Sequence, residues 1–202
     1  MRRASLWELR SAANAGVSRR GPDGMCAVEG RKNTVARSFA AIDFETATYD
    51  RDSACAVGVA IVEAGSLKTV EQYLIRPPTE RFTFTHIHGL TWADVKRAPT
   101  FREVWTELSA KFGAIEFFAA HNAGFDRSVL DACCARYGLE RPPLRFVCTV
   151  SLARSVLGIR PASLPNVCRC LGVRLRHHEA ASDAEACARI VLAAMERGWT
   201  IR

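Results

Sequence analysis

Three separate stretches of this chain carry acidic residues at spacings that suit metal-assisted cleavage of a phosphodiester. The acids are Asp43, Glu45, Asp126 and Asp183. A histidine, His178, stands five residues before the last of them. Mg²⁺ prefers carboxylate oxygens, and two such ions about 3.5–4 Å apart can activate water and steady a leaving oxygen. A histidine with a pKa near neutrality can take the proton from that water, so these residues together predict a two-metal hydrolytic site.

Each of these acids lies where a predicted element begins or ends. Asp43 and Glu45 are two residues apart on an expected strand, so their side chains leave from the same face. Asp126 follows an expected strand and opens a helix, and Asp183 lies in the first turn of the last helix. Taken singly, the acids also suit a solvated strand end or a helix cap, and His178 suits a surface position. Their joint occurrence at element boundaries favours one shared site.

The hydrophobic pattern that must position these residues predicts an α/β domain. Short β-rich runs cover residues 38–44, 54–62, 67–75, 115–120 and 146–150. Helical spacing covers 101–112, 126–137, a segment opening at Ser163, and 181–197. A tight connection at 63–66 suits a hairpin, so we expect an antiparallel meander of three strands. Strand–helix alternation after it predicts a mixed sheet with flanking helices, whereas residues 79–100 show no strong period.

The composition is that of a globular domain with a basic beginning. The 202 residues are 49% hydrophobic, and no run of about 18 uncharged apolar residues offers a membrane span. Residues 1–37 hold eight basic and three acidic residues, a net charge of +5, whereas residues 38–202 hold 20 and 18, a net charge of +2. We expect a disordered basic extension over 1–37 and a folded domain over 38–202, in a cytoplasmic protein. The extension also allows an organellar transit peptide, or a start codon upstream of a true start near Met25.

The eight cysteines show no C-x-x-C pair of the kind that zinc sites use. Cys133 and Cys134 share a helical stripe with Val129, Leu130 and Tyr137. We therefore expect reduced cysteines that pack as small apolar residues in a reducing compartment.

The acidic stretches have the form of three known motifs. They read Asp43-Phe44-Glu45-Thr46, His121-Asn122-Ala123-Gly124-Phe125-Asp126 and His178-Glu179-Ala180-Ala181-Ser182-Asp183-Ala184. They resemble the Exo I, Exo II and Exo III motifs of DEDDh-type exonucleases, in the DnaQ-like family that includes the proofreading ε subunit of bacterial DNA polymerase III. A histidine five residues before the last aspartate marks this type. His177 is one position out of register, so we expect its side chain to point elsewhere.

The resemblance covers nearly all of 38–202 and implies an RNase H-like fold with 3′→5′ release of nucleoside 5′-monophosphates. It assigns two Mg²⁺ ions, for which Mn²⁺ can substitute, to the four acids, and the general-base role to His178. The residues it implies around the 3′-terminal nucleotide are Phe44, Thr46, His88, Gly89, Leu90, Asn122 and Phe125. Phe125 could equally pack in the core, and Asn122 could stabilise a turn.

Three functions remain open at this level. The favoured one is an exonuclease on 3′ ends of mainly single-stranded DNA; the same chemistry on RNA and a nucleic-acid-binding module without turnover are the alternatives. All five catalytic positions are filled, which favours an active enzyme. Because the sequence ends four residues after Gly198, we expect no polymerase-tethering tail. We also expect no membrane partner and a stand-alone role in DNA repair or turnover.

Overall fold

The computed structural model describes residues 37–201. The predictions for residues 1–37 are a disordered extension, a transit peptide or a start near Met25. All of these residues except Arg37, and Cys26 among them, lie outside the described part of the chain. Arg37 forms an ion pair with Glu116, and its carbonyl accepts the N–H of Gly65 at 3.0 Å.

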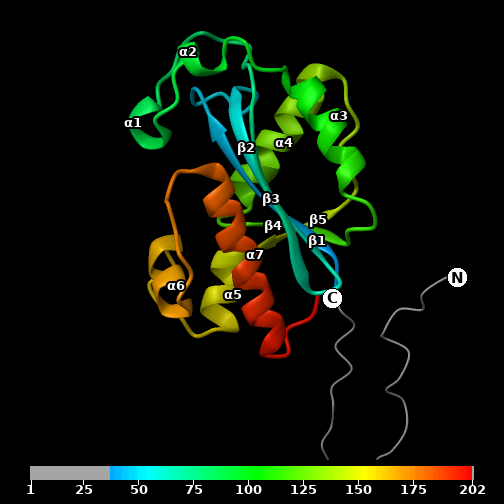
Figure 1. Cartoon of the computed structure of the whole chain (residues 1–202), viewed down its shortest axis with the longest axis vertical. Helices are drawn as coiled ribbons and strands as arrows, with labels where there is room; N and C mark the ends of the chain where they lie inside the picture. The colour runs from blue at the N-terminus through cyan, green and yellow to red at the C-terminus, as the bar shows by residue number, and fades with distance from the viewer. Residues whose placement is uncertain (1–36, 202) are drawn as a thin grey trace, which may run out of the picture. The chain divides into compact units, whose positions relative to one another are not determined.

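Five strands form one mixed sheet in the order β3-β2-β1-β4-β5 (Figure 1). They are β1 (Phe39–Thr46), β2 (Ala54–Glu63), β3 (Ser66–Leu74), β4 (Phe117–Ala120) and β5 (Arg145–Cys148). The first three pair antiparallel, and β4 and β5 join parallel to β1 and to each other. The predicted meander and the mixed sheet are therefore confirmed.

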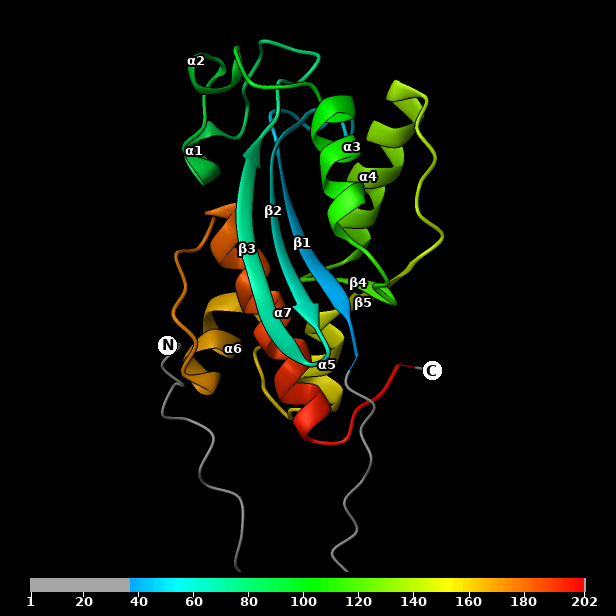
Figure 2. The same ribbon diagram turned by 45° about the vertical axis from the view of Figure 1, so that its right-hand side comes forward.

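Seven helices accompany the sheet among the described residues. They are α1 (Thr85–His88), α2 (Trp92–Val95), α3 (Phe101–Lys111), α4 (Gly124–Tyr137), α5 (Thr149–Ser155), α6 (Leu164–Leu171) and α7 (Ala180–Glu196). Helices α3 and α4 cover one face of the sheet, and α5 and α7 cover the other (Figures 1 and 2). Each face thus has its own hydrophobic core.

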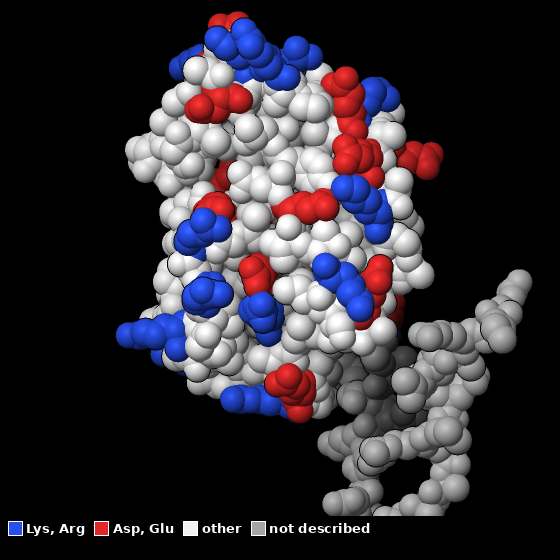
Figure 3. All heavy atoms as spheres, viewed as in Figure 1, with Lys and Arg blue, Asp and Glu red and all other residues white. Residues whose placement is uncertain are grey.

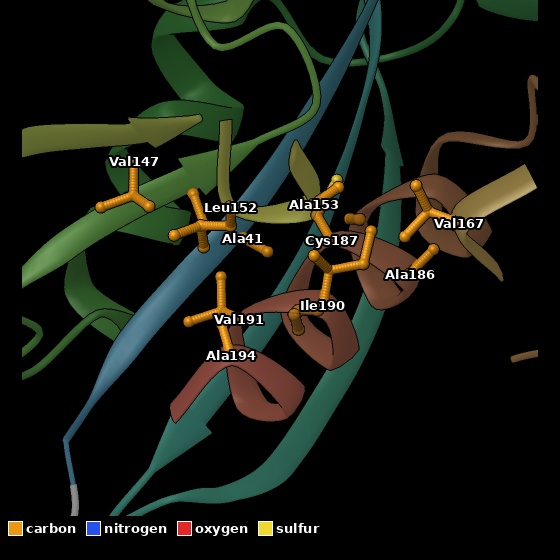
Figure 4. Close-up of a cluster of buried hydrophobic side chains, with 14 of the residues drawn as sticks. Ala41, Val147, Leu152, Ala153, Val167, Ala186, Cys187, Ile190, Val191 and Ala194 are labelled. Carbon is orange, nitrogen blue, oxygen red and sulfur yellow. The ribbon is translucent and has the colours of Figure 1, made fainter. Parts of the chain in front are cut away.

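Strand β1 supplies both cores through alternate residues. Ala41 packs with the α5 and α7 side chains, whereas Ala40 and Ile42 pack with α3 and α4. Figure 4 shows the first of these cores, in which Val191 of α7 lies near Ala41. Because a strand sends successive side chains to opposite faces, the fully apolar start of β1 is what a central strand between two helical layers requires.

The hairpin between β2 and β3 forms where the sequence predicts it. Its two turn residues, Ala64 and Gly65, have φ values of 46° and 75°, and Glu63 pairs with Ser66. Two positive φ values in a two-residue loop match the right-handed twist of the flanking strands.

Two parts of the predicted pattern differ from the structure. The strand expected over 146–150 ends at Cys148, and α5 begins at Thr149 instead. Thr149 is fully buried and its hydroxyl donates to the carbonyl of Ala120 at 3.3 Å, so a tertiary contact turns the chain away from the sheet. Residues 79–100, in which the sequence shows no hydrophobic period, contain the single-turn helices α1 and α2. A helix of one turn is too short to produce a period.

The cysteines that the structure describes are free thiols, and Cys133 and Cys134 are buried as predicted. Within residues 37–201, no helix combines the length and the apolarity needed to cross a bilayer.

Candidate active site

Four carboxylates from β1, α4 and α7 and a histidine from the loop before α7 line one pocket of about 290 Å³. They are Asp43, Glu45, Asp126, Asp183 and His178. Residues that are far apart in the sequence therefore meet at one place, as the three acidic stretches predict.

Strand β1 places Asp43 and Glu45 on the same side of the sheet, with Phe44 between them in the opposite core. The strand pairing is regular as far as Glu45 and shifts between Glu45 and Thr46. The parallel pairing of β1 with β4 ends at Ala41, so the two carboxylates lie beyond the end of that ladder, where side chains can face a pocket.

Helix α4 carries Asp126 in its first turn, where the free N–H groups of a helix favour an acid. The carboxylate is 1% exposed, and its Oδ1 accepts the backbone N–H of Phe44 at 3.0 Å. This hydrogen bond ties α4 to β1. Burial raises the pKa of Asp126 to about 7, even though the Phe44 N–H opposes the rise.

Helix α7 brings Asp183 into the same pocket. Its Oδ2 accepts the backbone N–H of His178 at 3.0 Å and lies 2.9 Å from Nδ1 of His177. Its Oδ1 is the buried side-chain oxygen that has no hydrogen-bond partner within the described part of the chain. A buried unpaired oxygen is costly unless a ligand satisfies it.

The expectation that His177 points elsewhere is wrong. His177 and His178 both line the pocket, and their rings stack with centroids 3.9 Å apart. The reason is local: His178 adopts a left-handed backbone with φ of 68°, which turns both imidazoles to the same side.

Glycine at position 58 allows α7 to approach the sheet this closely. Gly58 is paired with Asp43 across β1 and β2. A methyl group at this glycine would overlap the carbonyl of Ala180, the first residue of α7. The missing side chain therefore sets the distance between Asp183 on the helix and the acids on the strand.

The pocket is electrostatically unfavourable for its own carboxylates. Burial, followed by the charges of Asp126, Asp183 and Glu45, raises the pKa of Asp43 well above its ordinary value. Burial, then Asp183 and Asp126, raises the pKa of Glu45 to about 8. Like charges in a desolvated cluster behave in this way unless a cation joins them. Together with the unpaired oxygen of Asp183, this all-oxygen donor set fits divalent cations such as Mg²⁺.

The pKa of His178 is lowered, whereas the pKa values of the acids are raised. Partial burial and then the neighbouring His177 lower its pKa below 6.5, while Asp183 opposes that change. The imidazole is therefore largely neutral at pH 7 and able to accept a proton.

The residues expected around the substrate divide into two groups. Phe44, Thr46, Asn122 and Phe125 line the pocket. His88, Gly89 and Leu90 lie outside this lining, and their contact with the substrate stays a prediction. His88 instead donates from Nε2 to the carbonyl of Thr46 at 3.2 Å and accepts the N–H of Leu90 at Nδ1 at 3.1 Å, so it fastens α1 to the end of β1.

Several other residues complete the pocket lining. They are Phe84, Ile87, His121, Leu164 and His177. The motifs gave no role to any of them, and the lack of a period over 79–100 hid the first two. His121 was named in the sequence only as part of the second motif. In the structure, Thr149 Oγ1 lies 2.8 Å from its Nδ1, and the carbonyl oxygen of Ala162 lies 3.0 Å from its Nε2. Its role is to hold the loop before Leu164 against β4.

Comparisons with known proteins agree with this architecture. The exonuclease family model RNase_T matches residues 40–191. The PolC-type DNA polymerase III of Thermotoga maritima is 32% identical over 168 residues, which cover 79% of this chain but only 12% of that polymerase.

Two solved structures extend the likeness to three dimensions. A structure of exonuclease X in complex with 5′-overhanging duplex DNA has a TM-score of 0.64 at 25% identity, covering 80% of this chain and 94% of that one. The nuclease domain of 3′hExo, described as a DEDDh family member bound to rAMP, has a TM-score of 0.69 at 19% identity, covering 83% and 96%. The predicted RNase H-like fold class is thereby confirmed.

Proposed function

Because the chain belongs to the exonuclease family whose model spans residues 40–191, we propose that it is a 3′→5′ exonuclease. It removes nucleoside 5′-monophosphates from the 3′ ends of DNA, chiefly single-stranded, with two Mg²⁺ ions. We assign this activity to residues 38–202. The observation that carries the proposal is the convergence of four carboxylates on one pocket in which Asp183 Oδ1 has no partner among the described residues.

The four carboxylates would hold the metal ions. They are Asp43, Glu45, Asp126 and Asp183. Divalent ions bound there would offset the negative charge of the phosphate and lower the pKa of the attacking water. The chain's own contribution is a set of acids already crowded together by β1, α4 and α7, so that binding a cation relieves their repulsion.

His178 would accept the proton from the attacking water. Its imidazole lines the pocket beside Asp183, and its lowered pKa keeps it neutral at working pH. The backbone hydrogen bond from His178 to Asp183 fixes the spacing between base and metal ligand. General-base catalysis of this kind is worth about 10²–10⁴-fold in rate.

The apolar part of the pocket would hold the 3′-terminal nucleotide. Phe125, Phe84 and Ile87 line it from α4 and the segment around α1. Phe44 also lines the pocket, but it is only 3% exposed and its ring packs near Phe101 in the opposite core. Aromatic rings stack on any base without reading its sequence, which suits an enzyme that removes every nucleotide in turn. Thr46 and Asn122 supply polar groups at the same pocket.

DNA is favoured because exonuclease X, the solved relative at 25% identity, is in complex with DNA. A matched pair of 5′-labelled DNA and RNA oligonucleotides tests this choice in Mg²⁺, in Mn²⁺ and in EDTA, with Asp43→Ala as the inactive control. We expect a ladder shortened from the 3′ end, faster on DNA, in both metals and none in EDTA. Faster shortening of the RNA oligonucleotide would show that RNA, not DNA, is the preferred substrate. Full activity in EDTA would refute the metal mechanism, and binding without cleavage in any metal would leave only a binding module.

A further inference from the structure

The loop 47–53 between β1 and β2 runs along the mouth of the pocket. Tyr49 lies edge-on to Phe84 with ring centroids 4.7 Å apart, and the guanidinium carbon of Arg51 lies 4.5 Å from the centroid of Phe125. Both phenylalanines line the pocket. Figures 1 and 2 show the same arrangement at the level of the ribbon, with the end of β1 between α1 and α4.

This loop is held by several hydrogen bonds, so its side chains have defined positions. Ala47 N–H donates to the carbonyl of Ser53 at 2.9 Å, and the Ser53 hydroxyl donates to the carbonyl of Asp50 at 2.6 Å. The carbonyl of Arg51 accepts from the Cys133 thiol of α4 at 3.8 Å. A side chain carried on a pre-organised loop loses less conformational entropy when it binds a ligand.

Arg51 is the basic residue that the aromatic wall of the pocket presents to solvent. None of the described residues that line the pocket is a lysine or an arginine. Figure 3 shows acidic and basic side chains mixed over the face in view rather than one broad basic surface. The ions that the four carboxylates would hold serve the scissile phosphate, so a phosphate upstream of it gains from a separate cation, and Arg51 is suitably placed.

Arg51 forms no ion pair with a carboxylate among the described residues, although its charge lowers the pKa of Asp126. The neighbouring acid, Asp52, pairs with Arg136 at 2.8 Å instead. Burial still raises the pKa of Asp126 to about 7 despite the nearby guanidinium. One face of the guanidinium is covered by Phe125, and its N–H edge is the part that binds phosphate in a fork geometry.

We propose that Arg51, oriented by Phe125, binds the first backbone phosphate upstream of the scissile one and thereby positions the strand whose last nucleotide occupies the pocket. The inference rests on the proposed exonuclease function. It adds a second recognition point to the site, outside the carboxylate cluster. It also predicts that substrates lacking this phosphate do not use Arg51.

The test compares Arg51→Ala, Arg51→Lys and the wild type on two substrates. One is a single-stranded DNA oligonucleotide, and the other is the p-nitrophenyl ester of thymidine 5′-monophosphate, which has no upstream phosphate. Losing a charge-assisted contact should lower kcat/KM on the oligonucleotide by about 10- to 100-fold in Arg51→Ala. The ester should be cleaved within about twofold of wild type, and Arg51→Lys should recover part of the loss. Arg189→Ala, which removes an exposed arginine from α7, is the charge-matched control and should change neither rate.

A modified oligonucleotide locates the contact. An uncharged methylphosphonate at the first upstream phosphate should slow the wild type about as much as Arg51→Ala does, and should slow the variant no further. If Arg51→Ala lost the same factor in kcat/KM on the ester and on the oligonucleotide, Arg51 would act through the fold. If the methylphosphonate slowed the wild type and Arg51→Ala equally, the contact would lie elsewhere. Either result overturns the proposal. If the wild type cleaves neither substrate with Mg²⁺ or Mn²⁺, the exonuclease function itself fails.

Discussion

Gly58 should be the position at which the smallest added side chain does the most damage to the site. A methyl group there would overlap the Ala180 carbonyl and would stand 2.5 Å from the backbone nitrogen of Ala181. The nearest overlaps are 1.9 Å with the carbonyl oxygen and 2.1 Å with the carbonyl carbon of Ala180. Ordinary carbon contacts need about 3.5 Å, so α7 would have to move by more than about 1 Å. Asp183 moves with that helix, whereas Asp43 stays on β1.

The magnitude follows from this displacement. Misplacing a reacting group by about 1 Å can cost about 10²-fold in rate. Overpacking lowers the unfolding free energy by about 1–3 kcal/mol, which exceeds the gain of about 0.5–1 kcal/mol from replacing a strand glycine. We therefore expect Gly58→Ala to lose about 10²-fold in kcat/KM and to melt several degrees lower, at about 2–4 °C per kcal/mol.

Thermal melting and exonuclease kinetics on a 5′-labelled oligonucleotide measure the two effects separately. Gly124→Ala is the matched control, because a Cβ added there meets nothing within 4 Å. The control should cleave like the wild type and melt no lower than it, because a helix gains up to about 1 kcal/mol when alanine replaces glycine. A Gly58→Ala protein with wild-type melting and wild-type rate would refute the argument that the contact between β2 and α7 sets the position of Asp183.

The remaining predictions concern charge and protons in the pocket. Without metal, Glu45 and Asp126 have pKa values raised to about 8 and about 7; groups with a raised folded pKa stabilise the fold at low pH and lose that contribution as pH rises. The free energy of unfolding in EDTA should therefore fall by several kcal/mol from pH 5 to pH 8, at about 1.4 kcal/mol for each unit by which a pKa is raised. Mg²⁺ should reverse the loss at pH 8, and a flat profile would contradict this. Asp43→Ala should abolish cleavage yet melt higher than the wild type in EDTA at pH 8, because repulsion is relieved; a retained rate above about a tenth of wild type would remove Asp43 from the metal set. His178→Ala should cost about 10²–10⁴-fold, and His177→Ala about 10-fold through its hydrogen bond to Asp183; a larger loss at His177 would exchange their roles.

Much of the site could be predicted because its determinants are local. An acid at the end of an apolar strand or in the first turn of a helix is visible in a short window, since strand alternation and helix capping act over a few residues. Asp43, Glu45, Asp126 and Asp183 are all of this kind, and all four line the pocket. The meander and its tight connection at 63–66 were predicted for the same reason, although the strands extend into that connection and leave a loop of only two residues.

What the tertiary structure decided depends on contacts between distant segments. His177 faces Asp183 because of the left-handed backbone at His178, and Phe84 lines the pocket because His88 fastens α1 to the carbonyl of Thr46. The close approach of α7 to Gly58 has no signal in the strand pattern at all. The sequence by itself thus determined which residues could do the chemistry, since residue type and local period carry that information. Packing decided which neighbours complete the pocket, because a contact across the sheet depends on shapes that no short stretch of sequence contains.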